Sequence, residues 1–407
     1  MTRSELLEII ANRENSGVEF KRDEIRPEQL AKEIVAFANF KGGRVLIGVE
    51  KDGAISGIGR PQLEEWVMNA VFGRVTPQII PYYEEIEVEA GKRVAVVSVE
   101  RGVNKPYAVR DGERLDFFIR VGSESRRADR DTLRRLFQAS ENIHFETTPV
   151  SGATWEHFDQ TRVRGYFQLV RRFDELPDNQ DHKSWEHLLI NNDYMLATEH
   201  GKVVATVAGC ALFQKQPSRF LPAAGVNAAA FRGLEKEYDS LARERFDMPM
   251  VALPRKRHPA ANGLVEEVLA FVQPYSSGEA LHGARRIRQW IYPKEVIREA
   301  LLNGLIHRDW TIPTDVELAI YADRLEIVSP GALPNTVTVE KMRAGVRVPR
   351  NPIIMRTMQD CGYVEAMGMG VRNMIRGMLV HNGTEPDFIE TEDRFTVRLW
   401  RVQKPKE

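Results

Sequence analysis

The alternation of apolar and polar positions predicts an α/β (α+β) protein, in which short strands and amphipathic helices follow one another along the chain. Val18 to Lys21 alternates as a strand does, and Pro27 opens a segment whose apolar residues recur at helical spacing as far as Asn39. Arg44 to Val49 is typical of a buried strand. The Asp52-Gly53 pair predicts a hairpin turn into a return strand over 54–58. We therefore expect one compact unit near the amino end.

The same patterns extend over the rest of the chain. Further helices are predicted over 3–13, 61–71, 129–137, 153–173, 185–190, 263–272 and 293–307. Further strands are predicted over 82–88, 93–99, 116–121, 206–213, 227–231, 316–321, 325–328 and 395–400. Recognisable motifs occur only towards the two ends. We therefore expect a first domain over 1–140, a linking region over 141–284 and a second domain over 285–407.

Composition limits the class of protein. The 407 residues are 43% hydrophobic and 28% charged, as in soluble globular proteins. The net charge is −1, so contact with nucleic acid would need a local basic patch. The two cysteines have no metal-binding spacing, and no apolar run approaches the length of a membrane span. We expect a cytoplasmic protein with no membrane contact.

Acidic residues and a lysine gather in the first 52 residues. Glu19 and Lys21 lie two apart on the predicted strand and so share a face, and Glu14 and Asp52 are close by in the predicted unit. One interpretation is a Mg²⁺ or Mn²⁺ site for phosphodiester cleavage, because carboxylate oxygens bind these ions and a lysine can hold the phosphate. The other interpretation is an ordinary solvated charged surface.

Basic residues are concentrated further along the first domain. Arginine binds phosphate oxygens in pairs, which favours a nucleic-acid contact here. The alternative is that these arginines pair with nearby acids such as Glu113, Glu124, Asp129 and Asp131. The candidate contacts among the basic residues are Lys105, Arg120, Arg126, Arg127 and Arg130.

Three motifs in this region together resemble a known domain. The runs ENSGVEFKR, IVAFANFKGGRVLIGVEKDGAISGI and KPYAVRDGERLDFFIRVGSESRRA are similar to the Alba-like domain of Schlafen proteins, over about residues 1 to 140. The resemblance implies nucleic-acid binding and, by analogy with nuclease members, cleavage of structured RNA such as transfer RNA. It implies a metal triad of Glu14, Glu19 and Asp52, with Glu50 an alternative third acid, and Lys21 at the scissile phosphate. Because the resemblance extends through the IRVGS turn, it also favours Arg120 and Ser123 as phosphate contacts. Many bacterial relatives are described only as predicted transcriptional regulators.

The last third carries a second group of motifs. Glu299, Asn303 and His307 recur every four residues and share one face of a predicted helix, which indicates a lined pocket or a buried polar network. Glycines further on, at Gly368 and Gly370, can form a loop that cradles phosphate through backbone amides.

These motifs also resemble a family. The runs YPKEVIREALLNGLIHRDW, RLEIVSPGALP, RNPII and EAMGMGV are similar to a divergent Bergerat ATP-binding domain, as in gyrase, histidine kinases and MutL. The resemblance implies that Asn303 holds magnesium on the nucleotide phosphates and that Glu299 activates water. The family box whose aspartate reads adenine is Ser329-Pro330-Gly331 here, and we assign Gly331 to the same nucleotide site.

Two functions follow as hypotheses. The first is a metal-dependent endoribonuclease, or at least a binder of RNA or DNA, controlled by a domain that senses ATP or another nucleotide. The alternative is a non-catalytic DNA-binding transcriptional regulator. A homo-oligomer is expected, because each Alba-like module can need a second lobe to complete a groove.

Overall fold

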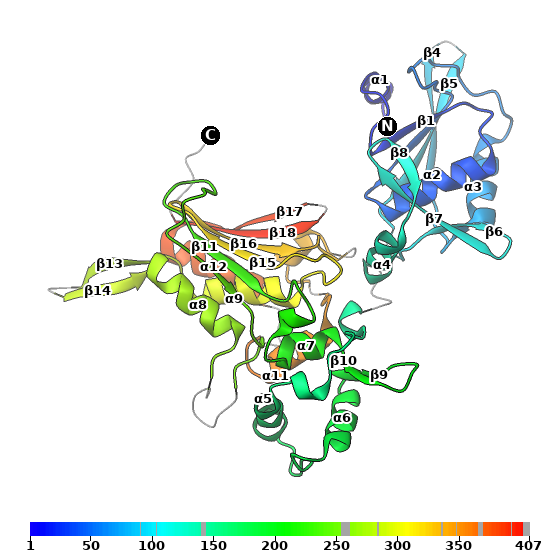
Figure 1. The fold of residues 1–407 in the computed structure, drawn as a ribbon. Helices are drawn as coiled ribbons and strands as arrows, with labels where there is room; N and C mark the ends of the chain where they lie inside the picture. Colours follow the sequence, from blue (N-terminus) through cyan, green and yellow to red (C-terminus); the bar gives the residue numbers. More distant parts are fainter. Residues whose placement is uncertain are drawn as a thin grey trace. The chain divides into compact units, whose positions relative to one another are not determined.

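The computed structural model describes all residues except 90, 103, 140–143, 254–260, 283–284, 335–336, 347, 365–368, 392 and 402–407. The chain forms two compact units, unit 1 (Met1–Ile143) and unit 2 (His144–Glu407). Each unit has its own buried apolar core. Helices and strands alternate in both units (Figure 1), which confirms the predicted α/β class.

Unit 1 contains two four-stranded sheets. The first has the order β1-β2-β5-β4, with β1 (Val18–Lys21) parallel to β2 (Gly42–Ile47), and with β5 (Lys92–Glu100) and β4 (Tyr82–Glu89) antiparallel. The second is antiparallel and has the order β3-β6-β7-β8, formed by β3 (Val75–Thr76), β6 (Ala108–Asp111), β7 (Arg114–Val121) and β8 (Glu124–Arg127). The helices are α1 (Arg3–Ala11), α2 (Pro27–Asn39), α3 (Leu63–Arg74) and α4 (Arg130–Ala139).

Helix α2 packs against strands of both sheets, which explains why its buried residues are not confined to one stripe. At its end, the Asn39 amide donates to the carbonyls of Tyr107 and Phe118, at 2.8 Å each, and accepts from the Tyr107 amide. A side chain at Gly43 would lie 2.2 Å from the Phe37 ring, so only glycine fits there. The FAN-x-x-GG motif therefore joins α2 to the strands around it.

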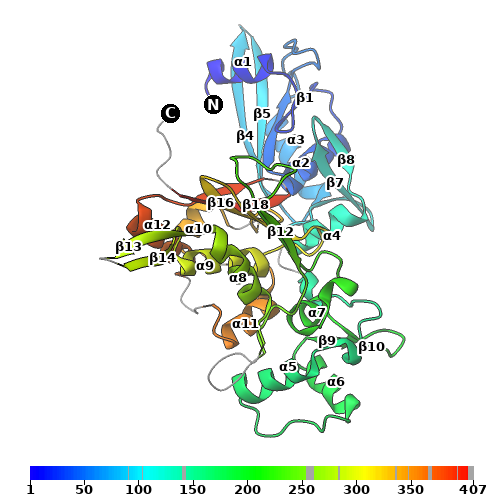
Figure 2. The same ribbon diagram turned by 60° about the vertical axis from the view of Figure 1, so that its left-hand side comes forward.

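Unit 2 is built on a six-stranded sheet of order β12-β11-β15-β16-β18-β17. In this order the strands are β12 (Ala242–Phe246), β11 (Val226–Ala230), β15 (Val316–Ile320), β16 (Arg324–Pro330), β18 (Arg394–Trp400) and β17 (Asp387–Glu390). All neighbours are antiparallel except β11 and β15. Figures 1 and 2 show α8 (Leu264–Tyr275), α9 (Lys294–Ile306) and α12 (Gly370–Asn382) on one side of this sheet.

Smaller elements complete unit 2. Two hairpins form separate two-stranded sheets: β9 (Met195–Ala197) with β10 (Val203–Ala205), and β13 (Ser277–His282) with β14 (Arg285–Trp290). The remaining helices are α5 (Gln160–Gly165), α6 (His182–Ile190), α7 (Val207–Phe213), α10 (Val339–Arg343) and α11 (Pro352–Asp360). There are also short 3₁₀ turns, η1 (Phe145–Thr147), η2 (Trp155–His157) and η4 (Pro217–Arg219), and a π-helical turn, η3 (Tyr166–Val170).

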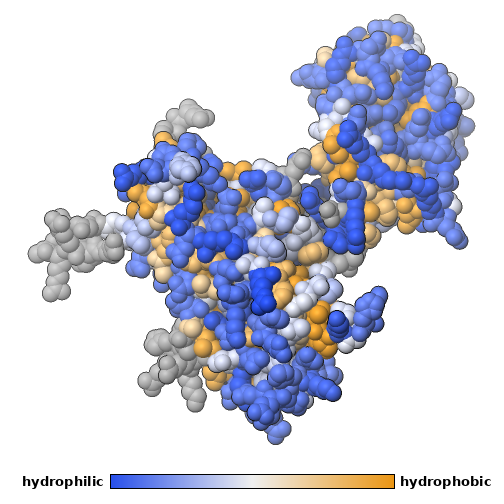
Figure 3. All heavy atoms as spheres, in the orientation of Figure 1, coloured by the Kyte–Doolittle hydropathy of each residue, from blue (hydrophilic) through white to orange (hydrophobic). Residues whose placement is uncertain are grey.

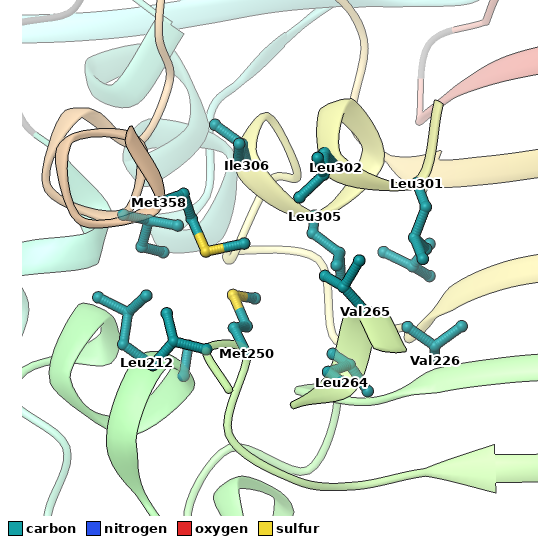
Figure 4. Close-up of a cluster of buried hydrophobic side chains, with 14 of the residues drawn as sticks. Leu212, Val226, Met250, Leu264, Val265, Leu301, Leu302, Leu305, Ile306 and Met358 are labelled. Atoms are coloured by element: carbon teal, nitrogen blue, oxygen red, sulfur yellow. The ribbon is translucent and has the colours of Figure 1, made fainter. Parts of the chain in front are cut away.

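The predicted linking region over 141–284 is wrong as a separate part of the chain. Its strand β11 pairs in parallel with β15, and its helix α8 packs on α9 and β11. Figure 4 shows one apolar cluster in which Leu212 of α7 and Val265 of α8 lie with Leu305 of α9 and Met358 of α11. Residues from both sides of position 285 therefore share one core.

Three local predictions are also wrong. Residues 206–213 form not a strand but helix α7, which begins where the Thr206 hydroxyl accepts a 3.0 Å hydrogen bond from the Gly209 amide. The long helix predicted over 153–173 is divided into η2, α5 and η3. The return strand over 54–58 is reduced to a single bridge between Val49 and Ile55.

The surface in Figure 3 is largely hydrophilic, with hydrophobic residues in small areas between the polar ones. Among the helices that the structure describes, none has the length and apolar character needed to cross a membrane.

Candidate functional sites

Unit 1 contains a network of four charged side chains, of which Glu19, Glu33 and Arg120 are buried and Lys21 is partly exposed. Arg120 Nη1 lies 2.8 Å from Glu19 Oε2 and 3.3 Å from Glu33 Oε2, and its side chain is 0% exposed. Lys21 Nζ lies 2.5 Å from Glu19 and 3.3 Å from Glu33. The Ser125 hydroxyl donates to Glu33. The network links β1, α2, β7 and β8, and two acids balance two cations in it.

The network changes the chemistry expected of Lys21. Burial alone would lower the pKa of this lysine, but Glu33 and Glu19 outweigh that effect and raise its pKa above the ordinary value. Lys21 therefore stays protonated and is already paired with two carboxylates. Glu33 was missed in the sequence, because it looks like one more polar residue of an amphipathic helix.

The structure does not bring the predicted metal triad together. Glu14 Oε1 accepts a 2.9 Å hydrogen bond from the Phe20 amide, and Asp52 is exposed and accepts from the Ala54 amide within its own turn. Glu50, the alternative third acid, pairs with Arg22 at 2.5 Å. Within the described parts of the chain, no three His, Cys, Asp or Glu side chains could share a metal ion. The described acids of unit 1 therefore do not form the three-carboxylate site that the resemblance implies.

Two of the predicted nucleic-acid contacts are buried, which corrects the prediction. Arg120 belongs to the network above, and Lys105 is 4% exposed with its Nζ donating to the Phe40 carbonyl at 2.8 Å. Burial lowers the pKa of Lys105 to about 7, and the charge of Arg101 adds to this effect. Neither side chain can reach a phosphate in this structure.

The other four predicted contacts are exposed on or beside β8. Ser123 lies in the turn before this strand, and Arg130 opens α4. Arg126 and Arg127 are 65% and 56% exposed and pair with Glu124 and Asp116. Such exposed pairs contribute little stability, so a phosphate can replace the carboxylate at low cost. This part of unit 1 is the candidate nucleic-acid surface.

Unit 2 contains a cavity of about 410 Å³ between α9, α12 and the strands β16, β17 and β18. Ligand pockets commonly have volumes of about 300–1,000 Å³. Glu299, Asn303, Gly331 and Gly370 all line it, so the structure brings together four residues assigned to one site from the sequence. Gly368, the fifth, lies outside the described residues. His307 also lines the cavity.

One end of the cavity has the groups that a magnesium-bound phosphate needs. Asn303 Nδ2 donates to Glu299 Oε1 at 3.1 Å, so an amide and a carboxylate stand side by side. A Cβ at Gly370 would lie 1.7 Å from Glu299 Oε1, so the backbone at the start of α12 comes close to the carboxylate only because residue 370 is glycine. Magnesium is commonly held by one or two oxygen ligands of the protein together with substrate phosphates. These residues fit a magnesium–nucleotide complex.

The other end is more apolar and carries aromatic rings. Ser329 is opposite Phe395 in the pairing of β16 with β18, and the rings of Phe395 and Phe388 stack with centroids 6.4 Å apart. All three residues line the cavity. The Ser329 hydroxyl donates to the Gly304 carbonyl at 2.7 Å, so this end offers an oxygen acceptor and flat apolar surface. A planar base is the kind of group that such a surface accommodates.

Comparisons with known proteins match one family model to each of the two units. Residues 14–129 match the family model described as Schlafen, AlbA_2, and residues 314–399 match the model described as putative ATP-dependent DNA helicase recG C-terminal, of the HATPase type. These matches define a protein that joins a nucleic-acid module to an ATPase-related domain. The chain carries a Schlafen AlbA-type domain followed by a RecG C-terminal-type domain, as its motifs predict.

Solved structures are more distant. The chain shares 21% identity, at a TM-score of 0.46, with the DIP2311 protein from Corynebacterium diphtheriae, over 98% of this chain and 80% of that one. It shares 21% identity, at a TM-score of 0.26, with the N-terminal domain of a putative ATP-dependent DNA helicase RecG-related protein from Nitrosomonas europaea, over 32% of this chain and 94% of that one. Among curated proteins, none matches the chain.

Proposed function

We propose that this protein binds nucleic acid through unit 1 and a magnesium-bound nucleotide in the cavity of unit 2, and that it acts as a nucleotide-responsive regulator. The observation that carries the proposal is the convergence of Glu299, Asn303, Gly331 and Gly370 on one cavity of about 410 Å³. The carboxylate, the amide and the close backbone suit a phosphate group with its metal ion, and the aromatic end suits a base.

Binding to nucleic acid is supported by the exposed arginines around β8. Arg126 and Arg127 extend from neighbouring positions of one strand, and Arg130 follows three residues later at the start of α4. With a net charge of −1 over the whole chain, a local group of this kind must supply the attraction to phosphate. The partner is a sugar–phosphate backbone, of RNA or DNA.

Binding without cleavage is favoured over a ribonuclease by the state of Glu19. Its carboxylate is paired with both Lys21 and Arg120, so a divalent cation would have to compete with two positive charges in a buried site. Neither Glu14 nor Asp52 joins it. In this proposal the acids of unit 1 are structural.

The test uses the full chain with labelled transfer RNA, single-stranded RNA and double-stranded DNA, each with and without Mn²⁺ and Mg-ATP. Fluorescence anisotropy reports binding, and denaturing gels report cleavage. We expect binding to at least one nucleic acid, a change in that affinity with Mg-ATP, and no cleavage. Manganese-dependent cleavage by the wild type that is lost in a folded Glu19→Gln variant would establish the ribonuclease instead.

A further inference from the structure

The cavity of unit 2 has two ends that are far apart along α9. Glu299 and His307 both line the cavity, and eight residues of helix span about 12 Å. Glu299 stands beside Gly370. The 329–332 turn, in which the end of β16 passes into the loop after it, lies instead just past the end of the helix, where the Asp309 amide donates to the Pro330 carbonyl at 2.7 Å. The second end is formed by two pieces of backbone, the end of α9 and the 329–332 turn.

Arg350 connects these two pieces directly. Its Nη1 donates to the His307 carbonyl at 3.2 Å and its Nη2 donates to the Ala332 carbonyl at 2.5 Å. Gly331 has φ of +100°, and a Cβ there would lie 2.4 Å from Arg350 Nη1. The guanidinium therefore packs closely against the turn at the residue that lines the cavity.

Asn351 holds the end of the helix. Its Nδ2 donates to the carbonyls of Ile306 and Arg308, at 2.7 and 2.9 Å, and the residue is wholly buried. Its Oδ1 has no hydrogen-bond partner among the described residues, although a buried polar atom without one is costly. The two hydrogen bonds that Nδ2 donates to the backbone beside His307 are therefore what accounts for an asparagine at this buried position.

We infer that Arg350 and Asn351 are positioning residues, which fix the end of the cavity formed by His307 and the 329–332 turn in the shape that accepts the nucleotide base. Neither side chain lines the cavity, so both act through the backbone that they hold. This inference rests on the proposed nucleotide function. It assigns a role to the Arg350-Asn351-Pro352 motif, which no part of the proposed binding chemistry uses.

The test compares wild type with Arg350→Lys and Asn351→Asp in the full chain. Lysine cannot bridge two carbonyls with a rigid fork, and aspartate cannot donate to either carbonyl. The control is Arg324→Lys. Arg324 Nη1 also donates to a backbone carbonyl, that of Leu234, but Arg324 is not among the residues that line the cavity. Calorimetry measures the dissociation constants of Mg-ATP, Mg-GTP and Mg-tripolyphosphate, and scanning fluorimetry measures the melting temperature without ligand.

We expect each variant to weaken nucleotide binding at least tenfold, with tripolyphosphate binding unchanged, because the phosphate end does not depend on Arg350 or Asn351. The melting temperature without ligand shows whether each variant is folded at the assay temperature, and dissociation constants are compared only among folded proteins. Equal losses for nucleotide and tripolyphosphate, or unchanged nucleotide affinity, would overturn the inference. If tripolyphosphate binds too weakly to measure, the ratio of the ATP and GTP dissociation constants decides: a changed ratio supports the inference and an unchanged ratio overturns it. A wild type that binds no nucleotide overturns the proposed function itself.

Discussion

Arg120 donates a 2.8 Å hydrogen bond to Glu19, a residue 101 positions earlier in the chain. Both side chains are buried, and Glu33 and Lys21 complete the group. A carboxylate that satisfies a buried guanidinium is part of the framework of the domain. The resemblance to Schlafen nucleases assigned the same glutamate to a metal ion, together with Glu14 and Asp52.

We predict that Arg120→Gln strongly destabilises unit 1, because it leaves two buried carboxylates with only Lys21 to balance them. Removing one partner of a buried ion pair typically costs about 3–5 kcal/mol. Hydrogen exchange of peptides from β1 and β2 under increasing urea measures the loss. Arg93→Gln is the matched control, since Arg93 is 59% exposed in its pair with Glu85 and should contribute about 1 kcal/mol or less. Equal effects of the two changes would contradict a structural role for the network.

Mg-ATP at a hundred times its dissociation constant should stabilise unit 2 by about 2.7 kcal/mol, since it binds only the folded state. Asn303→Ala should remove the resulting rise in melting temperature. Gly370→Ala should remove it too, because a Cβ there would lie 1.7 Å from Glu299 Oε1. Scanning calorimetry with and without ligand measures both. Gly278→Ala is the control glycine, with no atom within 4 Å of the added Cβ. Retention of the full shift in Asn303→Ala would show that the ligand binds elsewhere.

Replacing Arg126, Arg127 and Arg130 together by alanine should weaken nucleic-acid binding and reduce its salt dependence. For duplex DNA, the slope of log K against log salt should become less steep by about 0.9 for each phosphate that the protein no longer neutralises. Anisotropy titrations at salt concentrations from about 50 to about 200 mM measure this slope. The control replaces Arg3, Arg22 and Arg93 by alanine. These three arginines are also exposed, so their replacement removes the same positive charge. The arginines around β8 are not the contact surface if both triple variants give the same slope.

Lys105 should make the stability of unit 1 depend on pH. Its pKa is about 7 in the folded protein against 10.5 for an ordinary lysine, so between these values the unfolded chain binds more protons than the folded one. Stability therefore rises with pH in this window, by up to about 1.4 kcal/mol per pH unit. Lys105→Met should abolish this part of the rise in urea titrations between pH 7 and 9. An identical pH profile in the variant would mean that Lys105 keeps its ordinary pKa.

Much of the fold could be predicted from the sequence, because local periodicity survives folding. The helical spacing of α2 and α9 and the alternation in β5 gave elements close to their observed bounds. Residues 207–213 were misassigned because every one of them is buried, and an apolar run without polar positions has no period to measure. The capping position of Thr206 was the signal that could have corrected the assignment.

The candidate sites also contain some residues that local spacing could place and others that only tertiary packing brings together. Glu299 and Asn303 lie on one helix, so their spacing was enough to place them side by side. Glu33 and Arg120 come from α2 and from β7, 87 residues later, and only the packing of the helix on the second sheet brings them together. Burial also decided the role of Lys105 and Arg120, and a sequence shows a positive charge without showing whether solvent reaches it.

The parallel pairing of β11 with β15 decides which pieces of this protein can be produced alone. A fragment beginning at residue 285, where the second group of motifs starts, would lack β11 and β12 and would leave the hydrogen-bonding edge of β15 open along Val316 to Ile320. Open edges of this kind pair with other chains and promote aggregation. A fragment of unit 2 that is meant to fold alone therefore has to begin near His144, so that β11 and β12 cover the edge of β15.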